Sequence, residues 1–520
     1  MIDCDVPIHD TARRARFVLL NPPAGAVAGN TWQRFGQVIG MHQNVAMAPE
    51  LTLHEDRLFS ADGAVRQISR RIYAETKDLP IISPHGHVPP AWMSENLSFG
   101  NPTRLLLTPD HYINRILHAN GVELSELGVP VTRTDMTEAD NRAAWRTFCA
   151  HWSDFNGTAM RYWLTDQLVG VFGVTQRPSI ETADEIYDTI QAWIDDDNHR
   201  PRALMDQFKI EFIATTDDPC DDLHDHEKLA ADAEFSAKHR VAPTFRPDKY
   251  LTPANPDWNQ RVDTLGEVAG VDVSTLAGLT SALENRRAYF KAHGGVSTDH
   301  GIQDLDAAYL DAQDAERLYG KARAGEITAA EATALHHHLI MDQVRMATED
   351  GLTLTLHPGA FRDHDRATFE AYGADVGCDI PYAIEVTRAT REMLNRFGNH
   401  PNLNLVLFTL DEDVYSREIA PLAGFYRSLY IGVPWWFIDA PESIMRFKQS
   451  VTEMAGFSRI SGMIDDTRAF CSIPARHDMM RRLDAAHLAN LVAAHRLDED
   501  EAIEQARKLV VDNPKKVFKL

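Results

Sequence analysis

Two histidines separated by one glycine end an apolar run, LPIISPHGH, at residues 79–87. Residues two apart on a strand point to the same side, so His85 and His87 would project together beyond the strand end. Two imidazoles on one side are half of a plausible metal site. The ordinary alternative is a pair of hydrogen-bonded structural histidines, because the chain contains 23 histidines in all.

Further polar side chains follow other apolar runs. His357 stands in TLHPG, Asp465 and Asp466 follow RISGMI, and three arginines stand at predicted strand ends: Arg246 in FRPD, Arg362 in AFRDHD, and Arg468 in DDTR. Arginine binds carboxylates in a two-pronged geometry, so these arginines are candidates for holding an anionic substrate.

The elements that must position these residues are short apolar runs, which alternate along the chain with stretches of helical periodicity. This alternation predicts a parallel sheet covered by helices, and we expect an α/β fold with a (β/α)₈ barrel. An open doubly wound sheet is the alternative, but the chain lacks the glycine-rich turns typical of that fold. Seven runs are visible and one is missed: residues 79–85, 210–218, 240–248, 352–359, 402–411, 429–437 and 459–468.

In a barrel, the carboxyl ends of the strands form one active site, and the first and last strands are neighbours. His85 and His87 would therefore meet Asp466. Residues 1–50 are expected to form an N-terminal extension, and residues 51–520 a single barrel domain. Residues 100–205 and 260–348 are too long for ordinary loops and are interpreted as large, mostly helical insertions.

Composition excludes several classes of protein. The chain has 520 residues, of which 44% are hydrophobic, so it can bury a large core. Its net charge of −24 argues against nucleic acid or an anionic membrane as a partner. Five scattered cysteines without a CxxC pair favour reduced thiols in the cytoplasm. Barrels of this kind are often homo-oligomers, and the sequence does not decide the number of subunits.

From about Leu51 onward the chain resembles the uronate isomerases, the glucuronate isomerase family of the amidohydrolase superfamily. The resemblance rests on motifs spread along the chain: LPIISPHGH, DHY at 110–112, TTDDPCDDL at 215–223, PTFRPD at 243–248, DHG at 299–301, LHPGAFRDHD at 356–365, GADVGCD at 373–379, VPWWFID at 433–439, GMIDDTRAF at 462–470 and RHDMMRRL at 476–483.

The resemblance implies a distorted (β/α)₈ barrel that holds one divalent metal ion, with Zn²⁺ the expected ion, and a small sugar acid as substrate. It implies interconversion of an aldose uronate and its ketose form, D-glucuronate with D-fructuronate or D-galacturonate with D-tagaturonate. His85, His87 and Asp466 resemble the metal ligands. Asp466, Tyr112 and Arg468 resemble the catalytic groups that move the proton.

For several other residues the sequence allows two roles. His111, His357 and Trp435 are candidates for binding substrate, although His357 could be a third imidazole at the metal and Trp435 an ordinary core aromatic. Asp217 and Asp218 precede Pro219, and this pattern fits the start of a helix as well as it fits a direct role in the site. RHDMMRRL is interpreted as a basic helix start on the outside of the barrel, with the alternative that Arg476 reaches the site.

Two other functions compete with isomerisation. A metal-dependent hydrolase or decarboxylase could use the same barrel, because loop changes redirect this machinery. Against it, no lysine stands on a middle strand where it could carry a carbamate between two metals. A non-catalytic sugar-acid binder is the third hypothesis, and the joint presence of His85, His87, Asp466, Tyr112 and Arg468 argues against it.

Overall fold

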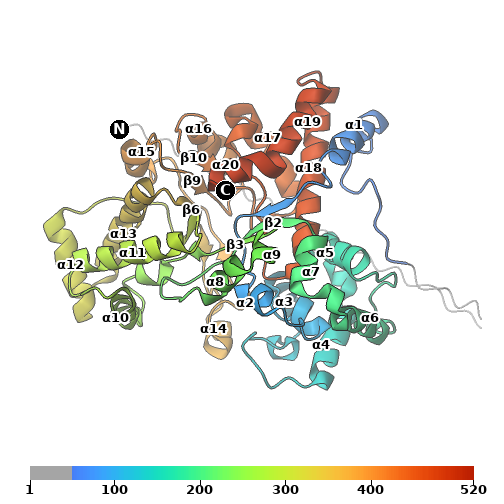
Figure 1. Ribbon diagram of the computed structural model, residues 1–520, viewed down its shortest axis with the longest axis horizontal. Coiled ribbons are helices and arrows are strands. Elements are labelled where there is room, and N and C mark those ends of the chain that lie inside the picture. The colour runs from blue at the N-terminus through green and yellow to red at the C-terminus, as the bar shows by residue number, and fades with distance from the viewer. Residues whose placement is uncertain (1–49) are drawn as a thin grey trace, which may run out of the picture. The chain divides into compact units, whose positions relative to one another are not determined.

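The computed structural model describes residues 50–520, so the predicted N-terminal extension lies outside the described residues except for its last position. Parallel strands stand at the centre and helices surround them (Figure 1). In chain order the parallel strands are β1 (Ile81–Ser83), β2 (Ile210–Ala214), β3 (Arg240–Ala242), β4 (Thr244–Phe245), β5 (Ser297–Ile302), β6 (Thr353–Pro358), β9 (Leu405–Leu407) and β10 (Leu429–Ile431).

These strands follow one another around a ring. β1, β2 and β3 form one sheet, and β4, β5, β6, β9 and β10 pair in the order of the chain to form a second. A parallel bridge between Asp217 and Phe245 joins the two sheets. β3 and β4 are separated only by Pro243, which has no N–H to donate to a ladder, so one barrel strand is divided in two.

The last predicted strand, residues 459–468, forms no regular ladder in the described chain, but it closes the ring. Ile460 bridges to Ile431 at the end of β10. The Asp466 amide donates to the His85 carbonyl at 3.4 Å, and the His87 amide donates to the Thr467 carbonyl at 3.0 Å. Eight chain segments therefore enclose the barrel, and the predicted distorted (β/α)₈ fold is confirmed.

The strand missing from the sequence prediction is β5, which lies inside the interval interpreted as a mostly helical insertion. Its sequence, STDHGI, is polar, yet every residue except Gly301 is buried. Pairing with β6 along its whole length satisfies its backbone, and Thr298, Asp299 and His300 all face protein. Apolar runs mark buried strands in sequence, so a buried polar strand is missed.

Helices cover the strands and fill the long intervals. Between β1 and β2 lie α2 (Pro90–Glu95), α3 (His111–Ala119), α4 (Glu138–Ala150), α5 (Ala159–Asp166), α6 (Ala183–Asp195) and α7 (Pro201–Gln207). Between β4 and β6, on either side of β5, lie α10 (Trp258–Ala269), α11 (Leu276–Ala292), α12 (Ala312–Ala324) and α13 (Ala329–Asp350). The other helices are α1 (Gly63–Ala74), α8 (His224–Ala231), α9 (Ala233–Ser236), α14 (Arg366–Tyr372), α15 (Arg391–Phe397), α16 (Ala420–Ala423), α17 (Pro441–Ala455), α18 (Ile473–Ala493), α19 (Glu499–Arg507) and α20 (Asn513–Phe518).

Capping residues set the ends of α13, and aromatic side chains hold α4 to α6. Thr328 and Glu331 form a reciprocal capping box at the start of α13, and Gly351 ends that helix with φ of 78°. In the first long interval, Trp145 of α4 packs on Phe148 of the same helix and on Tyr187 of α6, and its indole donates to the Ala183 carbonyl at 3.0 Å. Aromatic packing thus holds these helices to one another.

A buried ion pair joins α17 to α18. The Lys448 ammonium donates to Asp484, and the two side chains are 3% and 4% exposed. Burial raises the pKa of Asp484 even with this partner present. We expect Lys448→Met to lower the free energy of unfolding by about 3–5 kcal/mol, because it leaves a buried carboxylate unpaired. Urea unfolding measures this loss, and Lys516→Met on the exposed surface is the control, with an expected change within about 0.5 kcal/mol. Equal stability of the two variants would contradict the prediction.

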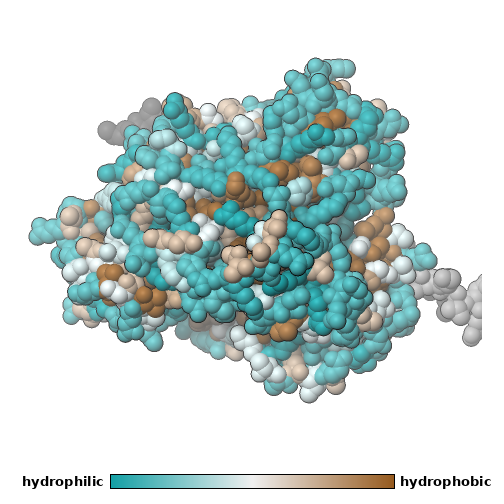
Figure 2. Space-filling model, in the orientation of Figure 1, coloured by the Kyte–Doolittle hydropathy of each residue, from teal (hydrophilic) through white to brown (hydrophobic). Residues whose placement is uncertain are grey.

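The face drawn in Figure 2 is covered mostly by hydrophilic residues, with hydrophobic residues in small separate groups. Among residues 50–520, no helix is long and apolar enough to span a membrane.

Candidate functional site

A cavity of about 580 Å³ lies at the carboxyl ends of the barrel strands. Its walls come from the segments that follow β1, β2, β4, β5, β6, β10 and the last barrel segment. All ten residues singled out in the sequence line it: His85, His87, His111, Tyr112, Arg246, His357, Arg362, Trp435, Asp466 and Arg468. The fold therefore brings together residues that are up to 383 positions apart in the chain (468 − 85 = 383).

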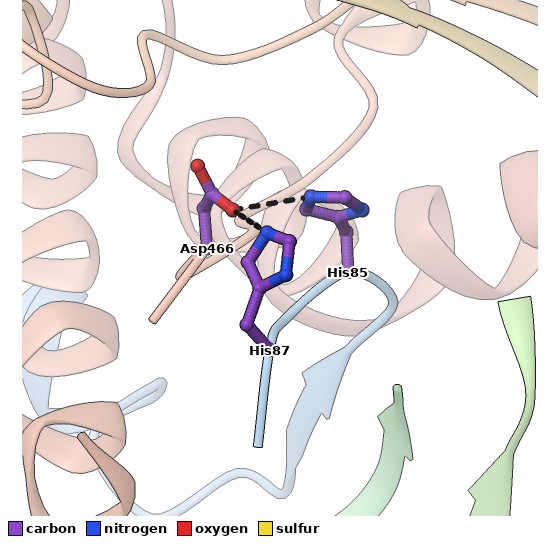
Figure 3. Close-up of side chains that lie close together, drawn as sticks. All are labelled: His85, His87 and Asp466. Carbon is purple, nitrogen blue, oxygen red and sulfur yellow. Dashed lines mark hydrogen bonds and ion pairs between the residues drawn. The ribbon is translucent and has the colours of Figure 1, made fainter. Parts of the chain in front are cut away.

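His85, His87 and Asp466 converge on one point, as Figure 3 shows. The Asp466 Oδ1 atom lies 3.1 Å from His85 Nε2 and 3.0 Å from His87 Nε2. Gly86 allows this turn to pack tightly, because an added Cβ would lie 3.3 Å from Asp465 Oδ1. Asp466 has φ of 44°, a conformation that non-glycine residues adopt at a cost and that is common at functional sites.

The charges of this cluster suit a cation. Burial alone would raise the pKa of Asp466, but the two imidazoles hold it well below its usual range, so the carboxylate is ionised. Burial lowers the pKa of His87, which keeps its ring neutral. Burial also opposes a proton on His85, but Asp299 and Asp466 outweigh it and raise the pKa of that ring. A cation would displace that proton when it binds.

A second set of ligand-type atoms adjoins the first. His357 Nδ1 lies 2.6 Å from Asp299 Oδ1, and the His357 ring stacks on the His85 ring with centroids 4.9 Å apart. His357 Nε2 is buried and has no hydrogen-bond partner in the described part of the chain. Two imidazoles and a carboxylate within 4.8 Å of one another, beside an unpartnered imidazole nitrogen, fit a divalent cation.

Each of the three predicted arginines is paired with a carboxylate. Arg246 Nη1 lies 3.1 Å from Asp299 Oδ2, and its Nε donates to Asp248 at 2.9 Å. Arg362 donates to Asp379 at 2.7 Å. Arg468 donates to Asp375 at 2.6 Å and lies 2.8 Å from His111 Nε2. These pairs hold the three guanidinium groups at the cavity wall. Their positive charges are thereby kept in place in a protein whose net charge is negative.

His111 and Tyr112 reach the cavity from the first turn of α3. Asp110 caps this helix by accepting from the Tyr112 and Ile113 amides, so the helix start faces the cavity. Trp435 lines the wall beside His357, with ring centroids 4.6 Å apart in an edge-to-face arrangement.

The pKa of His111 offers a test of this arrangement. Burial and the Arg468 guanidinium lower the pKa of His111 to about 4, whereas an unfolded histidine titrates near 6.5. The unfolded state therefore binds the extra proton between pH 6.5 and 4, and acid destabilises the fold in this window. We expect the wild type to lose about 2–3 kcal/mol more stability than His111→Gln between pH 7 and pH 4. Urea unfolding at several pH values measures the difference, and parallel curves for the two proteins would refute it.

The structure contradicts one interpretation of a motif and decides against one of two alternatives for another. RHDMMRRL does not start a helix on the outside, because it lies within α18, and Arg476 is 4% exposed and lines the cavity. Asp217 and Asp218 do not start a helix either, since α8 begins at His224. Both line the cavity, and burial raises the pKa of Asp217 to about 7.

Several cavity residues were missed by reasoning on sequence. Asp299 lies on the unrecognised strand β5, although the DHG motif marked its position. Asp439 was not singled out, and its pair with Arg476 has no local signal because 37 positions separate the two: Arg476 donates to Asp439 at 2.9 Å. Nothing in the spacing of Asp248 and Asp375 indicates that Asp248 pairs with Arg246 and Asp375 with Arg468.

Comparisons with known proteins agree with the geometry. The family model described as glucuronate isomerase matches residues 54–518. The uronate isomerase of Cutibacterium acnes is 60% identical over 472 residues, covering 91% of this chain and 99% of that protein. That of Corynebacterium efficiens is 46% identical and covers 91% of this chain and 100% of that protein.

Solved structures give the same answer for the fold. The crystal structure of glucuronate isomerase from Caulobacter crescentus superposes with a TM-score of 0.87 at 41% identity, covering 90% of this chain and 97% of that one. The uronate isomerase of Thermotoga maritima superposes with a TM-score of 0.83 at 28% identity, covering 90% and 99% of the two chains. The resemblance predicted from sequence is confirmed, and this chain belongs to the glucuronate isomerase family.

Proposed function

We propose that this chain interconverts an aldose uronate and its ketose form, with D-glucuronate and D-galacturonate as the aldose substrates. The prediction of a uronate isomerase is confirmed by the family and by its relatives, which are named uronate isomerases. One observation carries the assignment of the site: the Asp466 carboxylate faces both His85 and His87 in the cavity that Tyr112 and Arg468 also line.

A divalent ion, with Zn²⁺ the expected one, would be held by His85 Nε2, His87 Nε2 and Asp466 Oδ1. When bound, such an ion orients the sugar oxygens and lowers the pKa of a hydroxyl that it contacts. The ionised Asp466 is the base proposed to act on the reacting carbons.

The residues of the cavity can carry out the proton transfer. Asp466 takes the proton from C2 while O1 is protonated, which gives an enediol, and the proton returns to C1 as O2 loses its own. The Arg468 guanidinium donates to the oxygens on which charge develops, and the Tyr112 hydroxyl turns its proton from Asp439 to the same oxygens. Arg246 and Arg362 are proposed to bind the substrate carboxylate, and His111, His357 and Trp435 to hold the sugar ring.

The cytoplasm is the proposed location. All four cysteines of the described chain, Cys149, Cys220, Cys378 and Cys471, are free, as expected in a reducing compartment. The second candidate function, hydrolysis or decarboxylation on the same barrel, is not favoured by the comparisons.

Product analysis tests the proposal. Zinc-loaded protein is incubated separately with D-glucuronate and D-galacturonate, and ketose formation is followed by NMR. We expect ketose from at least one sugar, and the two rates rank the epimers. A decarboxylated or hydrolysed product, or no ketose from either sugar, would overturn the proposal.

A further inference from the structure

A buried arginine is connected through Asp439 to Tyr112, one of the proposed proton-transfer groups. Arg476 lies in the first turn of α18 and is 4% exposed. Its Nη1 atom donates to Asp439 Oδ2 at 2.9 Å and to the Asp465 carbonyl at 3.3 Å. Asp465 immediately precedes Asp466 in the chain.

Asp439 extends this connection to the tyrosine. The Tyr112 hydroxyl donates to Asp439 Oδ1 at 2.6 Å, while Arg476 occupies the other oxygen of the same carboxylate. The Phe437 amide donates to the Tyr112 oxygen at 2.9 Å. The hydroxyl is therefore held from two sides, and its direction depends on where Asp439 is held.

The environment of Arg476 leaves its guanidinium little freedom. Its Nε donates to Ser472 at 3.2 Å, and its central carbon lies 3.7 Å from the centroid of the Trp163 ring. Trp163 is fully buried and packs edge-to-face on Tyr112 with centroids 5.5 Å apart. A guanidinium that already bonds Ser472, Asp439 and Asp465 is placed to orient protein groups rather than to bind a substrate.

We infer that Arg476 is a positioning residue, which holds Asp439 and through it fixes the Tyr112 hydroxyl at the cavity wall, from which its proton can turn to the substrate oxygen. The longer contact with the Asp465 carbonyl, at 3.3 Å, helps to hold the guanidinium itself in place. This inference rests on the proposed function, because it assumes that Tyr112 moves a proton.

The test is a double-mutant cycle on kcat and KM. Arg476→Lys keeps the charge but loses the planar fork that reaches Ser472, Asp439 and Asp465 together. We expect kcat to fall by about 10- to 100-fold with KM changed by less than about 3-fold, because misplacing the hydroxyl costs transition-state binding alone. In a Tyr112→Phe background, Arg476→Lys should change kcat by less than about 3-fold, since the group that it positions is gone.

The same helix offers a matched control. Arg482 is 5% exposed, donates to Asp478 at 2.7 Å, and Tyr73 donates its hydroxyl to the same carboxylate, but none of the three lines the cavity. Arg482→Lys should leave kcat within about 3-fold of the wild type, which shows that disturbing an arginine–aspartate–tyrosine set on α18 is not itself the cause.

Three results would overturn the inference: unchanged kcat in Arg476→Lys, a raised KM with unchanged kcat, or effects of Arg476→Lys and Tyr112→Phe that multiply. Thermal unfolding of the same four proteins gives a readout that needs no turnover, and the two substitutions should shift the melting temperature by less together than the sum of their separate shifts. If the wild type converts neither sugar, the proposed function fails, and additive melting shifts would then reject the positioning role on their own.

Discussion

Replacing Asp466 with asparagine is expected to lower kcat by about 10³- to 10⁴-fold, the largest effect predicted for any single substitution here. Asparagine has the same shape but cannot accept the C2 proton. It also removes the negative charge that the two imidazoles face at 3.0 and 3.1 Å. Steady-state ketose formation measures the loss.

Metal content separates the two roles of Asp466. A variant that still carries the ion after gel filtration but does not turn over has lost the base, whereas a variant without the ion has lost a ligand. Asp413→Asn is the control, because Asp413 is exposed and does not line the cavity, and its kcat should equal that of the wild type. A kcat for Asp466→Asn within tenfold of the wild type would remove Asp466 from the reaction.

The second large effect concerns the ion itself. His87→Gln should weaken Zn²⁺ binding by more than about 100-fold. Loss of a residue that only hydrogen-bonds to a metal ligand already lowers metal affinity by about 10- to 100-fold. His87 suits this test better than His85 because its side chain is 21% exposed, compared with 3% for His85, so the substitution disturbs less packing. Competition with a coloured chelator measures the affinity.

Another cluster in the described chain provides the control for His87→Gln. Asp304, Asp306 and His337 also place their ligand atoms within 4.8 Å of one another, outside the cavity. His337→Gln should leave zinc affinity and turnover within about 3-fold of the wild type. If His337→Gln abolishes zinc binding and His87→Gln does not, the ion belongs to that other cluster.

Apolar patterning predicted seven of the eight barrel segments and missed the features that depend on three-dimensional context. Burial of Ser297, Thr298 and Asp299 on β5 is compensated by β6 and by Arg246, which no local window of sequence contains. The last barrel segment looked like a strand because it is apolar, yet it is held by single backbone contacts to Ile431 and His85.

In the candidate site, too, some residues could be predicted from the sequence and others could not. Histidines two apart and an aspartate after an apolar run are visible because their chemistry shows in local spacing. The groups that position them are not visible, since Asp439 lies 327 positions from Tyr112 and is itself held by Arg476. Arg246 and Arg362 were correctly placed at strand ends, but their pairing with Asp299 and Asp379 appears only in the structure.

Anomalous diffraction at the zinc absorption edge, from crystals grown with Zn²⁺, tests the central claim most directly. We expect a strong peak between His85 Nε2, His87 Nε2 and Asp466 Oδ1, about 2.0–2.2 Å from each. A peak at Asp304, Asp306 and His337 instead, with none between the two histidines and Asp466, would contradict it.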